Sequence, residues 1–167
     1  MAEAQRKDRQ LRSRRSIGGQ ALVEFTLVAP IFILLLFGII EGGRFVFYYE
    51  TLANATREGA RFAIVNGSNS MVCPTGPAEP PGWSCDPTGT SVEAKVRNTA
   101  IGIPGPAITV ERHWMDGDDA DGDIDDGFNS RGYRVLVRAM YTYTSLVPLV
   151  PIPPITVNAE STLVINN

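Results

Sequence analysis

The hydrophobic pattern begins with an uncharged run and continues as a helical stripe. Residues 25–40 read FTLVAPIFILLLFGII and carry no charged side chain. Beyond them, apolar or small side chains recur every three to four residues, opposite charged and amide side chains. The stripe consists of Phe45, Tyr48, Tyr49, Leu52, Ala55, Gly59, Phe62 and Ala63. The pattern predicts one helix from about Gln20 to Val65, apolar all round at first and amphipathic later.

Prolines and glycines then interrupt the regular pattern. Residues 67–90 contain five prolines and both cysteines, a composition typical of a loop. Thr90-Ser-Val-Glu93 has the spacing of a capping box and predicts a short helix through about Ala100. Strands are expected at 108–115, 133–143 and 155–165, the second with regular alternation of apolar and polar positions.

The uncharged run is slightly too short to cross a bilayer. It has 16 residues, whereas a membrane-spanning helix needs about 20. Including Ala21-Leu22-Val23 gives a span of about 21–40 but places Glu24 within it, at a cost of roughly 3 kcal/mol. Glu24 therefore either has a role in the membrane or extends its carboxylate to the nearby interface. Gly38 and Gly42 form a G-x-x-x-G spacing, which permits close helix packing.

Charge is distributed unevenly about this segment. Residues 1–19 carry six Lys and Arg against two acidic side chains, a net charge of +4, while residues 20–167 carry a net charge of −7. The positive-inside rule places 1–19 in the cytoplasm and exports the rest. The sequence FGIIEGGR after the run has no A-x-A-like cleavage site, so the segment is expected to stay attached. The basic cluster lacks interleaved aromatic residues, which argues against nucleic-acid binding.

The predicted elements indicate an α+β fold. The amphipathic half of the long helix and a small antiparallel sheet each have one apolar face, and packing them together buries both. The expected parts are a basic leader at 1–19, the long helix at 20–66, the loop at 67–90 and an exported α+β domain at 91–167.

The N-terminal residues also resemble a known family. A basic leader, Gly19 and then Gln20-Ala-Leu-Val-Glu24-Phe25 are similar to the processing site of type IV pilin-like precursors. More narrowly, GGQALVEFTLVAPIFILLLFGIIEGGRF followed by ANATREGARFAI resembles the TadE/TadG-like proteins, the pseudopilins of the tight-adherence (Flp) pilus of bacteria. The resemblance covers roughly residues 15–66 and implies a pilin-like plan.

This resemblance implies a function and a set of partners. A prepilin peptidase would cut between Gly19 and Gln20 on the cytoplasmic side of the cytoplasmic membrane. Glu24 would then neutralise the new ammonium group of a neighbouring subunit and guide assembly, because an unpaired buried charge is costly. The chain is much larger than the small major pilin, which implies a minor component in pilus assembly, adherence or secretion. Its partners would be other pilin subunits and the assembly platform.

Cys73 and Cys85 both lie in the loop. In an exported chain such a pair usually forms a disulfide, which would stabilise the fold by roughly 3 kcal/mol. The alternative is two free thiols. With only one histidine in the chain, the pair does not complete a zinc site.

An acidic run, DGDDADGDIDDG, follows the first predicted strand. Asp119, Asp121, Asp123 and Asp125 have the alternating spacing of calcium ligands, but no complete EF-hand loop is present. The run is therefore either a solvated hairpin tip or a calcium site.

No arrangement of residues points to catalysis. His113 is the only histidine and has no nucleophile or orienting group nearby in sequence, and no glycine-rich phosphate loop follows a strand. We expect a non-enzymatic protein. A second interpretation is a permanently anchored binding or receptor domain, with calcium as a possible ligand.

Overall fold

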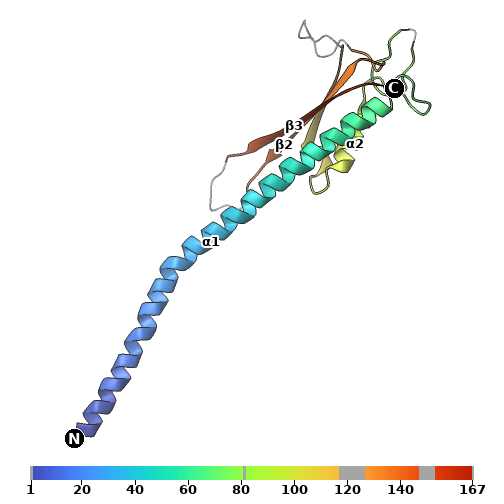
Figure 1. The fold of residues 1–167 in the computed structure, drawn as a ribbon. Coiled ribbons are helices and arrows are strands. Elements are labelled where there is room, and N and C mark those ends of the chain that lie inside the picture. Colours follow the sequence, from blue (N-terminus) through green and yellow to red (C-terminus); the bar gives the residue numbers. More distant parts are fainter. Residues whose placement is uncertain (1, 81, 117–126, 147–152, 167) are drawn as a thin grey trace. The chain divides into compact units, whose positions relative to one another are not determined.

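A computed structural model describes the backbone of residues 2–80, 82–116, 127–146 and 153–166, and the side chains of these ranges from residue 19 onward. The chain has the α+β, pilin-like fold expected: a long apolar N-terminal helix is followed by a three-stranded antiparallel sheet (Figure 1). Residue contacts divide the chain into two units, 1–43 and 44–167. We describe each unit by itself.

Helix α1 extends from Ala2 to Val65 and includes Pro30. Its end agrees with the sequence-based prediction, but its start lies well before Gln20. The leader has no proline and is rich in Ala, Gln, Glu, Arg and Lys, residues with high helix propensity, so the backbone remains helical there. In the first unit, nearly all side chains from residue 19 to residue 40 are exposed, including Phe25 and Ile31.

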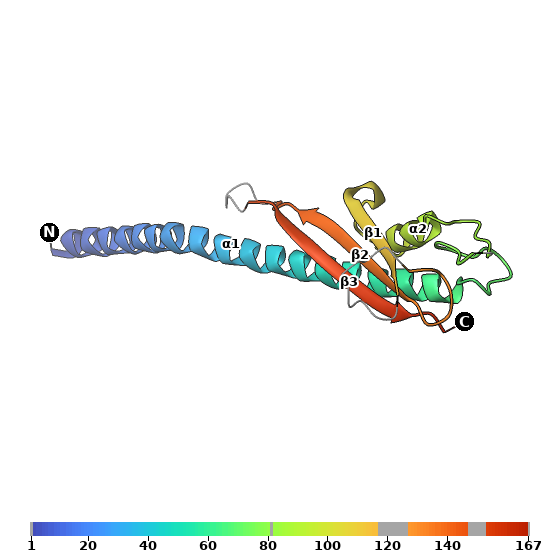
Figure 2. The same ribbon diagram turned by 90° about the horizontal axis from the view of Figure 1, so that it is seen from above.

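The sheet is a simple meander of strands β1 (Ile108–Met115), β2 (Arg134–Tyr143) and β3 (Ile155–Val164). Val137 of β2 pairs with Arg112 on one side and with Ser161 on the other. The three strands begin and end within one residue of the predicted positions, because prolines and glycines bound the runs of alternating residues. Figure 2 shows helix α2 (Thr90–Thr99) beside β1, and a 3-10 turn, η1 (Gly105–Ala107), precedes that strand.

The core of the second unit lies between the helices and one face of the sheet. It includes Leu52, Ala55, Ala60 and Ala63 of α1, Val92 and Val96 of α2, and Ile108, Val110, Val135, Val137, Ala139, Val157 and Ala159 of the sheet. On the opposite face, the Arg138 guanidinium contacts Glu111 at 3.5 Å and Glu160 at 3.2 Å. The alternation in each strand therefore separates a buried apolar face from a polar one.

One residue of the predicted helical stripe is misplaced. Tyr49 was expected on the buried face, but its side chain is 47% exposed. Tyr48, which is partly buried, instead contacts the core and the ring of Tyr141. The two tyrosines are adjacent, and about 100° of helical rotation separates their side chains, so only one of them faces the sheet.

Gly59 marks the closest approach of the elements. A methyl group at this position would overlap Cγ2 of Val96 and lie 3.5 Å from Cγ1 of Val137. Gly59→Ala should therefore lower the free energy of unfolding by about 1–3 kcal/mol through overpacking. Thermal or urea unfolding of the full chain in detergent measures the change. Gly43→Ala is the matched control, since no atom lies within 4 Å of the added methyl; equal effects of both substitutions would refute the packing explanation.

Candidate functional site

The candidate processing residues occupy consecutive turns of α1. The side-chain amide Nε2 of Gln20 donates a hydrogen bond of 3.1 Å to Oε1 of Glu24, and both residues are exposed. No atom lies within 4 Å of a methyl group built on Gly19. The helix thus places Gln20 and Glu24 on one face, one turn apart, and no contact among the described residues requires glycine at position 19.

Gly38 and Gly42 lie one turn apart and form an open notch on the helix surface. Nothing lies within 4 Å of a methyl group built on either residue. Within the part of the chain that the structure describes, nothing packs into the notch, and the G-x-x-x-G spacing is typical of a surface for close helix approach.

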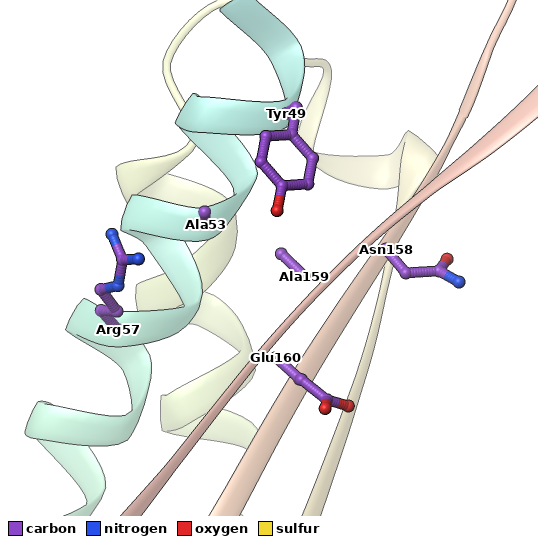
Figure 3. A pocket seen from close by; sticks show the side chains of 6 residues that line it. All are labelled: Tyr49, Ala53, Arg57, Asn158, Ala159 and Glu160. Atoms are coloured by element: carbon purple, nitrogen blue, oxygen red, sulfur yellow. The ribbon is translucent and has the colours of Figure 1, made fainter. Parts of the chain in front are cut away.

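A hollow of about 310 Å³ lies between the second half of α1 and the free edge of β3. Its lining consists of Tyr49, Ala53 and Arg57 from the helix and Asn158, Ala159 and Glu160 from the strand (Figure 3). The small side chains Ala53 and Ala159 leave the space, and the Tyr49 ring borders it. The hollow has a mixed lining, with Arg57 and Glu160 beside the two alanines. Sequence reasoning missed it, because two alanines from distant segments create it.

The helix that carries these residues is apolar enough to cross a membrane. Among the described residues it is the one helix that is long and apolar enough to do so. None of its most apolar 18-residue stretch is buried inside the structure. Comparison with protein-family models finds a similarity in this segment. Residues 19–61 match the TadE-like protein family. The matched segment contains Gly19, Gln20, Glu24 and the glycine notch, and it confirms the predicted resemblance there. Comparisons with curated proteins and with solved structures give no match.

The predicted disulfide lies beyond this TadE-like segment. Cys73 and Cys85 are bonded, with their Cα atoms 5.6 Å apart. The disulfide closes the loop next to a short parallel bridge between Thr75 and Asp86. The backbone N–H of Asn129 also donates a hydrogen bond of 2.7 Å to the carbonyl oxygen of Pro77, which connects the loop to the segment before β2.

Two glycines allow the loop to pack against the Trp114 side chain, near the end of β1. Gly76 and Gly89 both have positive φ angles, 97° and 69°. A methyl group on either glycine would overlap the Trp114 indole ring. Both the backbone conformation and the contact with the ring therefore require glycine at these positions. The disulfide-bonded loop is thus a packed part of the second unit.

Asp86 caps α2, and the predicted capping box is wrong. The Asp86 carboxylate accepts hydrogen bonds from the backbone amides of Thr90 and Ser91, at 2.9 and 2.7 Å, and from both hydroxyl groups. Glu93 instead forms ion pairs with Arg97 at 2.6 Å and Arg112 at 3.2 Å. Asp86 caps from four residues before the helix because the closed loop brings it back, a contact that the local capping pattern does not contain.

The same hydrogen bonds determine the ionisation of Asp86. Burial raises the pKa of its carboxyl group, but the hydrogen bonds from Ser91 and Thr90 outweigh burial and lower the pKa to about 2. The carboxylate is therefore the stable form in the folded protein over the whole physiological range.

The candidate calcium ligands Asp119, Asp121, Asp123 and Asp125 lie outside the described residues. Within the described residues, no group of three or more His, Cys, Asp or Glu side chains is arranged to hold a metal ion. His113 lies in β1 as expected, where its register partner is Leu136.

Asp86→Asn should destabilise the second unit by about 1 kcal/mol at neutral pH, the usual effect of losing a helix cap. Because folding depresses the pKa of Asp86, its stabilisation is complete above pH 4 and is lost as the pH falls toward 2. The difference between wild type and variant should therefore shrink over this range. Urea unfolding at several pH values measures it, with the exposed Glu79→Gln as a control. A difference that does not change with pH would contradict the assignment.

Proposed function

We infer that this protein is a minor pseudopilin of a tight-adherence pilus. The observation that carries the inference is the TadE-like match over residues 19–61, which contains the glycine, glutamate and apolar helix of a pilin-type precursor. The pilin-like arrangement of a long helix and a small antiparallel sheet supports it. The role is structural rather than enzymatic: the chain contributes surfaces for assembly.

The proposed mechanism starts with cleavage between Gly19 and Gln20 by a prepilin peptidase. Cleavage leaves an ammonium group on Gln20, at the start of a helix that is otherwise apolar for about five turns. Glu24 lies one turn further along the same face. An ammonium group at membrane depth requires a counter-charge, and the Glu24 carboxylate of a neighbouring subunit provides it. The pair sets the axial register between subunits.

The exposed apolar surface of α1 supports a change of neighbours during assembly, from lipid to the helices of other subunits. Lipid covers the surface while the chain is in the membrane, and neighbouring helices cover it after assembly. Helices gain no hydrophobic driving force from leaving lipid for one another, so close packing and polar contacts must favour assembly. The notch at Gly38 and Gly42 allows the close approach, and Glu24 adds the polar contact.

Gly19→Ala should block processing, so that cells with active prepilin peptidase accumulate the uncleaved precursor. Because the added methyl meets no atom within 4 Å, a defect would report recognition by the peptidase and not misfolding. N-terminal sequencing or mass spectrometry of the membrane fraction locates the mature end. Gly43→Ala should be cleaved normally. An intact leader in the wild-type protein would favour the permanently anchored receptor domain instead.

Glu24→Ala should still be cleaved but should reduce the incorporation of the protein into pili by at least about tenfold, since an unpaired charge costs several kcal/mol. Immunoblots of sheared pili and of membranes separate assembly from processing. Glu50→Ala, which removes an exposed carboxylate from the same helix, is the control. Normal piliation with Glu24→Ala would mean that Glu24 only extends to the interface.

A further inference from the structure

An aromatic cluster lies at the end of the second unit where its part of α1 begins. The Arg44 guanidinium lies over the rings of Tyr48 and Tyr143, at 5.7 and 5.6 Å from their centres. Phe45 packs edge-on against Tyr143 at 5.6 Å, and Tyr48 against Tyr141 at 5.4 Å. These contacts attach the first turn of this unit's helix to the end of β2.

Several exposed apolar side chains lie close to members of this cluster in the chain or in the sheet. A methyl group on Gly102 would lie 3.2 Å from the Phe47 ring, so the turn after α2 adjoins the helix. Ile155 is the register partner of Tyr143 in the sheet. The set, which we call the collar, comprises Val46, Phe47, Ile101, Leu146 and Ile155, each between 40 and 78% exposed.

The collar follows the membrane-capable run closely in the chain. Val46 follows Ile40 by six positions, about 9 Å at the rise of an α-helix. The headgroup region extends roughly 5–8 Å beyond the hydrocarbon core on each side. Helical side chains also point back toward the N-terminus, which brings Val46 and Phe47 nearer to the run than their Cα atoms.

The composition of this end suits a lipid interface. Tyrosine and tryptophan rings are enriched at the headgroup level of membrane proteins, where an apolar body meets a polar surface. By contrast, the exposed apolar residues Met71 and Val72 follow the opposite end of this unit's helix, beyond Val65.

We propose that the collar is a second membrane contact, which rests in the headgroup interface of the phospholipid bilayer on the outer side. The apolar run crosses the bilayer and the collar holds the sheet domain against its surface. The proposal rests on the membrane anchor and requires neither cleavage nor pilus assembly. Extraction of the subunit would then have to release both contacts.

Labelling of the full chain in lipid nanodiscs tests the collar. Because both native cysteines form the disulfide, single substitutions such as Val46→Cys or Ile101→Cys accept an environment-sensitive fluorophore. A lipid with a nitroxide on its headgroup should quench these labels about twofold, as expected for side chains at the headgroup level. Val72→Cys, which replaces an exposed valine beyond the opposite end of this unit's helix, should keep its fluorescence. Leu34→Cys with a nitroxide on the acyl chain reports insertion of the run.

The other outcomes overturn the proposal in distinguishable ways. Quenching at Leu34→Cys without quenching at Val46→Cys means that the chain is anchored but the collar stands clear of the bilayer. No quenching at Leu34→Cys rejects the anchor itself. The collar labels could also report a water-excluded environment that is lost when the protein is diluted in lipid. That result would mean that a second copy of the chain, and not the bilayer, covers the collar.

Discussion

The apolar surface on every side of residues 19–40 is the constraint on which the rest of the molecule depends. The exposed side chains include several phenylalanines, leucines and isoleucines. Such a surface is stable only in lipid or against other apolar helices, and a helix is the form in which one segment satisfies its own backbone hydrogen bonds there. The environment of this helix therefore has to be supplied from outside the chain, first by the bilayer and, in the proposed function, later by other subunits.

Helix α1 is continuous, so it links the apolar segment at residues 19–40 directly to the sheet domain. A single helix changes from apolar all round to amphipathic, so the element that meets lipid is also the element on which the core is built. Small residues make this possible: Ala55, Gly59 and Ala63 let the sheet and α2 approach the helix closely. A larger side chain at Gly59 would push α2 away from α1 and open the core of the sheet domain.

Local patterns predicted most of the architecture and part of the site. The end of α1, the three strands and the Cys73–Cys85 bond follow from hydrophobic period, turn residues and cysteine composition. The roles of Gly19 and Glu24 stay predictions that rest on the family resemblance. The Asp86 cap and the hollow between Ala53 and Ala159 were missed, because each depends on a return of the chain that no local pattern encodes. The helix was predicted to begin at about Gln20, where the apolar pattern begins, but the helix propensity of the leader extends it to Ala2.

The core of the sheet domain is closed without the apolar run. Every residue of the buried cluster comes from position 52 or later, and the partly buried residues packed against it begin at Phe45. Folding of this domain therefore does not depend on whether lipid or protein surrounds residues 19–40. The disulfide, the Trp114 contact with two glycines and the Asp86 cap further stabilise the end of the domain that follows Val65. This separation allows the helix to exchange one environment for another while the sheet domain keeps its structure, which is what the proposed function requires.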